Sequence, residues 1–210
     1  MKTNLLLKKL HIEGKEFLSS EELKRYCRSM GLDYENVIDH LLKRHYLIRI
    51  FRGIFYVRSP EETKPGRARY SHLNLVAKGL ALKGVENWSF GLYTALKLNN
   101  MTHEHFAVEY VVNDKIFRPR PITIAGYKFR FVKLASPLLR FGIIHDGLRY
   151  SDPEKTILDF IYIWRYNEIP KEKIVLDVTD WARNISKKRT REYAKRYPRT
   201  VREIAESVIG

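Results

Sequence analysis

The segment from Ser19 to Arg44 reads SSEELKRYCRSMGLDYENVIDHLLKR and predicts two helices joined by a tight turn. Ser19 and Glu22 form a capping-box pattern, in which each side chain accepts a hydrogen bond from a backbone N–H at the start of a helix. Apolar residues then recur at helical spacing on one face, at Leu23, Tyr26, Cys27 and Met30. Cys27 is therefore expected to be a small buried residue rather than a reactive thiol.

The second half of this segment predicts a helix with one apolar and one polar side. Gly31 can supply the positive φ of a tight connection, and Asp33 is a suitable N-cap for a helix from Tyr34 to Arg44. A step of 100° per residue places Val37, Ile38, Leu41 and Leu42 on one side of that helix. The same step places Asn36, Asp39, His40 and Lys43 on the other side. We expect a helix-turn-helix whose second helix exposes a short polar face.

The flanking sequence extends this pair into a larger motif. Upstream, an amphipathic helix is expected to end before Gly14, because apolar residues recur at Leu5, Leu6, Leu10 and Ile12. Downstream, the runs LIRIF (47–51) and IFYV (54–57) flank Arg52-Gly53, which is the pattern of a β-hairpin. Three helices followed by a hairpin predict a winged helix-turn-helix, a compact fold that reads DNA.

In a DNA-binding winged helix, the helix from Tyr34 to Arg44 would enter the major groove. Asn36 can pair with adenine, and Lys43 can reach guanine or a phosphate. The basic residues of the hairpin and those of the preceding helix would contact the DNA backbone. The predicted interface comprises Lys24, Arg25, Arg28, Asn36, His40, Lys43, Arg44, Arg49 and Arg52. The helix also has acidic residues at Asp33, Glu35 and Asp39, so a protein-interaction module is the alternative.

The overall charge also predicts an anionic partner. The 210 residues include 39 Lys and Arg against 24 Asp and Glu, which gives a formal net charge of +15. Lys187 to Arg202 has eight basic residues, opposed only by Glu192. We expect Lys187, Lys188, Arg189 and Arg191 to extend the DNA-binding surface. The alternative is an ordinary solvated surface.

No apolar run approaches the roughly 18 residues that a membrane span requires. We read no signal peptide in MKTNLLLKK, and one cysteine cannot form an internal disulfide or a cysteine-based metal site. The sequence therefore predicts a soluble, cytoplasmic protein with no membrane partner.

Composition divides the chain into a domain from 1 to 58, a linker from 59 to 70 and a second domain from 71 to 210. The linker contains two prolines and a glycine. Its Arg67 and Arg69 are further candidates for DNA-backbone contact, and the alternative is that they are ordinary solvated linker charges. The second domain is expected to be mixed α/β: two helices (73–82 and 90–98), several strands including a hairpin across Asp146-Gly147, and a helical end. The whole chain is thus expected to be α+β.

The helical end is expected to begin at Asp152, a suitable N-cap followed by Pro153. We expect Glu154 to be solvent-exposed and Asp159 to lie away from the apolar stripe of this helix. Further helices are predicted at 179–185, 187–196 and 200–208.

Catalytic motifs are absent: the sequence has no GxxxxGK[ST], GxGxxG, HExxH or GxSxG. His103 and His105 are two residues apart, but no further metal ligands accompany them. We therefore predict no catalytic residues, no metal site and no cofactor. A nuclease targeted by a winged helix and a ligand-responsive regulator remain alternatives.

Three stretches resemble the AbiEi antitoxin family: LIRIFRGIFYV (47–57), FGLYTAL (90–96) and DPEKTILD (152–159). The likeness runs from about Phe17 to Tyr166. It implies a non-enzymatic type IV antitoxin whose N-terminal domain represses its own operon at inverted repeats of double-stranded DNA. The second domain would counter a nucleotidyltransferase-like toxin.

Overall fold

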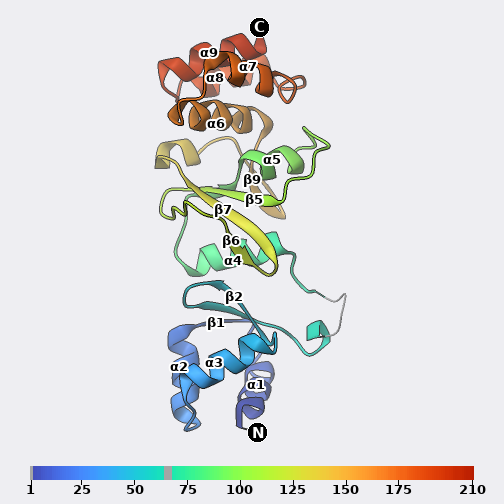
Figure 1. Ribbon diagram of the computed structural model, residues 1–210, viewed down its shortest axis with the longest axis vertical. Helices are drawn as coiled ribbons and strands as arrows, with labels where there is room; N and C mark the ends of the chain where they lie inside the picture. The colour runs from blue at the N-terminus through green and yellow to red at the C-terminus, as the bar shows by residue number, and fades with distance from the viewer. Residues whose placement is uncertain (1, 64–67) are drawn as a thin grey trace. The chain divides into compact units, whose positions relative to one another are not determined.

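The computed structural model describes residues 2–63 and 68–210, so Arg67 lies outside the described residues. The chain is α+β and forms two compact units. The first unit comprises residues 1–84 with 124–126, and the second comprises 85–123 with 127–210. Each unit has its own β-sheet (Figure 1).

The first unit begins with three helices and three strands. The order is α1 (Lys2–Ile12), β1 (Phe17–Ser19), α2 (Ser20–Ser29), α3 (Tyr34–Lys43), β2 (Leu47–Phe51) and β3 (Ile54–Val57). The strands form one antiparallel sheet in the order β1-β3-β2. The sequence pattern does not predict the third strand, in which Phe17 and Leu18 pair with Tyr56 and Phe55. The hairpin of β2 and β3 alone would leave one edge of β3 unpaired. A short apolar segment can cover that edge by pairing with it.

The caps and turns of this unit are as predicted. Ser19 and Glu22 form the complete capping box of α2, and the Asp33 side chain accepts from the Asn36 N–H at the start of α3. Gly31 and Gly53 have positive φ, as the turns before α3 and between β2 and β3 require. The core combines α1, α2, α3 and the sheet, and Cys27 is buried within it, as predicted.

The segment after β3 differs from the linker that we expected at 59–70. A 3-10 turn η1 (Glu61–Thr63) begins it, and Glu62 is buried, where it accepts hydrogen bonds from Tyr56 Oη at 2.5 Å and from the Ser59 and Arg69 N–H groups. Helix α4 (His72–Leu82) then packs on β2 and β3, so the compact units divide after Gly84. The sequence-based division, with its linker at 59–70, assigns this helix to the second domain.

The second unit contains a mixed six-stranded sheet in the order β6-β7-β5-β4-β9-β8. Its strands are β4 (Trp88–Phe90), β5 (Val108–Asn113), β6 (Ile122–Ile124), β7 (Tyr127–Lys133), β8 (Ile143–Asp146) and β9 (Leu148–Ser151). Strand β5 runs parallel to β7 and β4 runs parallel to β9. The β8–β9 hairpin turns at Asp146-Gly147, as predicted.

Helices lie on one side of this sheet (Figure 1). They are α5 (Leu92–Leu98), α6 (Pro153–Tyr166), α7 (Lys171–Thr179), α8 (Lys187–Ala194) and α9 (Arg199–Ile209), and a 3-10 turn η2 (Ser136–Leu139) precedes β8. Helix α5 packs on β5 and β9, α6 packs on α5, and α7, α8 and α9 pack on α6. The helices predicted at 187–196 and 200–208 are confirmed within two residues at each end. The helix predicted at 179–185 is wrong, because α7 ends where we expected that helix to begin.

The start of α6 also corrects an expectation. Asp152 is its N-cap and Pro153 its first residue, as predicted. Glu154 and Asp159, however, are both buried, where we expected exposure for Glu154 and a position away from the apolar stripe for Asp159. Ser186 at the N-cap of α8 donates to Glu154, and Tyr197 in the turn between α8 and α9 donates to Asp159. Both carboxylates are therefore satisfied inside the unit, which accounts for their burial.

None of the helices in the described residues is both long enough and apolar enough to span a membrane.

Candidate nucleic-acid interface

Helix α3 presents its polar residues to solvent. Val37, Ile38 and Leu41 are buried, and the four-residue spacing of Asn36, His40 and Arg44 places these exposed side chains on one face. Lys43 is exposed beside them, with its Nζ 2.7 Å from Asp39 Oδ2. Because both side chains of this pair are largely exposed, the pair is weak and Lys43 can exchange Asp39 for another anion.

The acidic residues of this region have local roles. Asp33 caps α3 through the Asn36 N–H at 2.9 Å, and Glu35 lies in the first turn of α3, where the helix dipole favours an acid. Asp39 pairs with Lys43. Asp33 and Glu35 thus stabilise the start of α3, which accounts for part of the acidic content of this region.

Helix α2 contributes exposed basic residues. Arg25 and Arg28 have no ion-pair partner within the described residues. Lys24 Nζ lies 5.1 Å from the centre of the Tyr34 ring, and the Tyr34 hydroxyl donates to Ser20 Oγ at 3.2 Å. This cation–π contact fixes the direction of Lys24 without neutralising its charge.

The β2–β3 hairpin adds two arginines. Arg49 is exposed on β2, with its guanidinium 5.7 Å from the centre of the Phe55 ring. Arg52 is exposed in the turn, where Gly53 has φ +80° and its carbonyl accepts from the Ser20 N–H at 2.9 Å. The turn is therefore tied to the start of α2, and Arg52 projects from a fixed backbone.

All nine predicted residues of the first unit are exposed, but not all of the predicted C-terminal residues are free. In the second unit, Lys187 Nζ donates to the Gly210 carbonyl at 2.8 Å. Arg189 pairs with Glu154 at 3.4 Å, and Arg191 pairs with Glu206 at 3.1 Å. Lys188 is the one of the four without such a contact among the described residues.

The remaining candidates are Arg69, considered for DNA-backbone contact, and the histidine pair considered for metal binding. Arg69 forms an ion pair with Glu16, and its guanidinium lies 5.5 Å from the centre of the Tyr70 ring. His103 and His105 are exposed, and no group of three or more potential metal ligands occurs in the described ranges. Burial raises the pKa of the Cys27 thiol, which is consistent with a packing role for this residue.

Comparison with known proteins provides a fold likeness. No family model and no curated protein matches the sequence. Among solved structures, the chain is similar to the crystal structure of the RV2827C protein from Mycobacterium tuberculosis, with 15% identity and a TM-score of 0.60. The alignment covers 99% of this chain and 76% of that one, so the likeness concerns the fold of the whole chain.

Proposed function

We propose that this chain is a DNA-binding transcriptional repressor that acts as an AbiEi-type antitoxin. The observation on which the proposal mainly rests is the exposed face of α3, with Asn36, His40 and Lys43 on the helix and Arg44 at its C-cap. A helix of this size fits the major groove, where amide and basic side chains read base edges. The net charge of +15 favours the same partner.

We further propose that the first unit is a winged helix-turn-helix. The order helix, strand, helix, helix, strand, strand and the sheet order β1-β3-β2 support this assignment. In it, α3 is the recognition helix and the β2–β3 hairpin is the wing. Lys24, Arg25 and Arg28 on α2, with Arg49 and Arg52 on the wing, would contact phosphates and set the register on the duplex.

The test is the salt dependence of binding to the DNA upstream of the chain's own gene, where an inverted repeat is expected. Log affinity should fall linearly with log salt concentration, because phosphate contacts release counterions. Arg52→Ala should reduce the slope by about 1, which is the expected effect of one lost phosphate contact. Lys8→Ala, at an exposed position on α1, is the matched control and should leave the slope unchanged.

Asn36→Ala tests base reading separately from phosphate binding. A bidentate amide contact contributes about 1–3 kcal/mol of discrimination between bases. The variant should lose preference for the operator over unrelated DNA while keeping the salt slope of the parent. Binding that is independent of salt, or an operator preference that survives Asn36→Ala, would contradict the proposed interface.

The second unit is proposed to make a smaller contribution to DNA binding. Lys188 is available, whereas Arg191 is engaged by Glu206 at 3.1 Å. Lys188→Ala should therefore weaken operator binding more than Arg191→Ala. Equal affinity in both variants and the parent would remove these helices from the interface.

The antitoxin role rests on the three stretches that resemble the AbiEi family. This resemblance implies a non-enzymatic, cytoplasmic protein that counters a nucleotidyltransferase-like toxin. Co-expression with a neighbouring gene of that class should relieve its toxicity, and the two products are to be tested for co-purification. Unrelieved toxicity would contradict the antitoxin role without affecting the DNA-binding proposal.

A further inference from the structure

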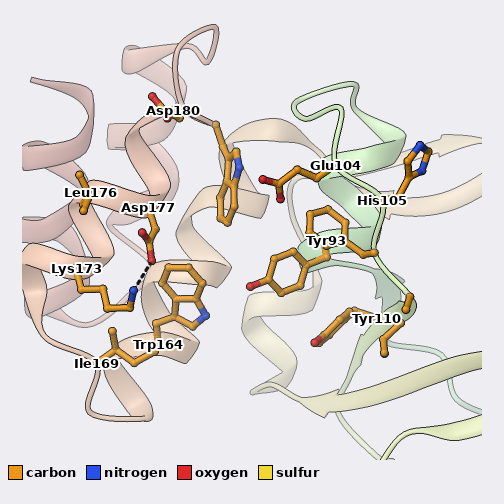
Figure 2. A pocket seen from close by; sticks show the side chains of 14 residues that line it. Tyr93, Glu104, His105, Tyr110, Trp164, Ile169, Lys173, Leu176, Asp177 and Asp180 are labelled. Carbon is orange, nitrogen blue, oxygen red and sulfur yellow. Dashed lines mark ion pairs between the residues drawn. The ribbon is translucent and has the colours of Figure 1, made fainter.

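The second unit contains an open cleft of about 920 Å³ between its sheet and its helices. Six residues define its chemistry: Tyr93 on α5, Glu104 in the following loop, Tyr110 on β5, Trp164 on α6, Asp177 on α7 and Trp181 just after α7. Figure 2 shows Tyr93, Glu104 and Tyr110 on one wall, with Trp164 and Asp177 on the opposite wall. The volume is within the range of roughly 300–1,000 Å³ that is typical of small-molecule sites.

The aromatic side chains form a continuous lining. The Tyr93 ring centre lies 5.3 Å from that of Tyr110 and 6.0 Å from that of Trp181. Trp181 lies 6.1 Å from Trp164, so it links the two walls. All four rings are partly exposed rather than buried. The electron-rich faces of Tyr and Trp attract cations, and they do so more strongly where water is partly excluded.

The charge of the cleft is opposite to that of the chain. Glu104, Asp177 and Asp180 line it, against the single lysine Lys173. Asp177 pairs with Lys173 at 3.2 Å, and Asp180 pairs with Arg183 at 2.7 Å. The Glu104 carboxylate has no hydrogen-bond or ion-pair partner among residues 2–63 and 68–210. A protein of net charge +15 therefore concentrates acidic side chains around one aromatic surface.

Polar atoms of the aromatic lining are also available to a ligand. The hydroxyls of Tyr93 and Tyr110 and the indole N–H groups of Trp164 and Trp181 have no hydrogen-bond partner within the described part of the chain. Figure 2 shows the Tyr93 hydroxyl directed across the cleft toward the opposite wall. Burial raises the pKa of this hydroxyl, and the negative charges of Asp177 and Glu104 raise it further. The electrostatic effect of both carboxylates therefore reaches the Tyr93 hydroxyl inside the cleft.

We propose that this cleft binds a small linear polyamine. The aromatic faces would hold the methylene chain and its ammonium groups, and the carboxylates on separate walls would each pair with one ammonium. A single cation would leave one wall unpaired, whereas a chain with two or three amines can reach both. The net positive charge of the protein weakens this binding only slightly, because charges more than about 8 Å from the ligand are screened at physiological ionic strength.

Lys173 acts as an internal competitor in this arrangement. Its ammonium already lies beside Asp177, where a ligand amine would bind (Figure 2). Since the Lys173 side chain is 62% exposed, the ligand can displace it. The proposal therefore makes two opposite predictions: removing the acid at Glu104 weakens binding, and removing the base at Lys173 strengthens it.

Tryptophan fluorescence provides a direct test on the full chain without DNA. Two of the three tryptophans line the cleft, and the third, Trp88, is buried. Spermidine should change the emission saturably, and increasing NaCl should weaken the effect. The uncharged 1,8-octanediol, which has a similar length, should have no effect at the same concentrations. Absence of a saturable change with spermidine, or an equal change with octanediol, would overturn the proposal.

Charge-neutralising variants locate the site. Glu104→Gln should weaken spermidine binding by about 5-fold, the equivalent of one favourable charge pair. Lys173→Gln should tighten binding by about the same factor. The matched controls on the same helix, Glu172→Gln and Lys171→Gln, are exposed and do not line the cleft, so they should leave affinity unchanged. The proposal fails if Glu104→Gln binds like Glu172→Gln.

A last comparison identifies the source of the amine. A capped tripeptide, acetyl-Gly-Lys-Gly-amide, presents one ammonium on a peptide backbone. Spermidine should bind more tightly than this peptide by at least 10-fold. Binding of the peptide without binding of spermidine would mean that the cleft receives a protein side chain, and the polyamine proposal would then be wrong. Because these measurements use no DNA, their outcome is independent of the repressor proposal.

Discussion

Lys155 and Asp159 form an ion pair in which both side chains are fully buried, with Nζ 2.6 Å from Oδ2. The Tyr197 hydroxyl donates to the other carboxylate oxygen at 2.7 Å, and the Lys155 ammonium lies 5.3 Å from the centre of the Phe141 ring. Removal of one member of such a pair leaves an uncompensated charge in a low-dielectric interior. This network joins α6 to the turn before α9, and it accounts for two charged residues inside an apolar core.

Asp159→Ala should therefore lower the free energy of unfolding by about 3–5 kcal/mol, as expected when a buried pair loses one partner. Replacing both charges, as in Lys155→Met with Asp159→Leu, should recover much of this loss. Urea denaturation followed by circular dichroism measures both effects. The control is Glu203→Ala, which breaks an exposed pair with Arg199 and should cost less than about 1 kcal/mol. A loss in Asp159→Ala no larger than in this control would contradict the assigned role.

At the scale of elements, helix α4 shows how closely packing can constrain a sequence. Gly79 is buried on the face of α4 that packs on β2 and β3. A Cβ at this position would lie 2.5 Å from Ile50 Cγ2 and 3.0 Å from the Phe51 ring. The close approach of helix and strand thus requires a glycine here, although glycine destabilises a helix relative to alanine.

Gly79→Ala should destabilise the first unit by about 1–3 kcal/mol through overpacking. In an exposed helix, the same substitution would stabilise by up to about 1 kcal/mol. The sign of the change in thermal unfolding therefore distinguishes the two situations. Leu82→Ala, at an exposed position of the same helix, should have little effect. A stabilised Gly79→Ala protein would mean that α4 does not pack on the hairpin.

At the scale of the whole molecule, tyrosine burial predicts sensitivity to alkaline pH. Six of the 13 tyrosines have raised pKa values, namely Tyr26, Tyr56, Tyr70, Tyr93, Tyr193 and Tyr197. The hydrogen bond to Glu13 raises the pKa of Tyr26 to about 12. Burial is the main cause for Tyr56, Tyr93, Tyr193 and Tyr197, and for Tyr70 it is the hydrogen bond to Glu16.

The free energy of unfolding should fall as pH rises above about 10. Tyrosine in the unfolded chain has a pKa near 10, whereas these six hold their protons to higher pH in the folded chain. Their contribution is thus complete below pH 10 and is lost progressively above it. Absorbance at 295 nm counts ionised tyrosines, and circular dichroism follows the fold. Ionisation of all 13 below pH 11 with the fold intact would contradict the prediction.

Local chemistry was sufficient to predict many elements from sequence. The capping box at Ser19, the cap at Asp33, the turn at Gly53 and the start of α6 each depend on neighbours within four residues. The exposure of the nine candidate DNA-binding residues in the first unit followed from helical and strand periodicity. Their contact with DNA remains a prediction.

Features that depend on distant partners could not be predicted in this way. Strand β1 exists because β3 offers it an edge, and α4 joins the first unit because Gly79 admits the hairpin side chains. Asp159 is buried because Tyr197, 38 residues away, satisfies it. The aromatic and acidic cleft arises from residues between 93 and 181 that have no common sequence pattern. Sequence determined the local elements because short-range sterics and hydrogen bonds define them, whereas tertiary structure decided burial and partnership through contacts between distant residues.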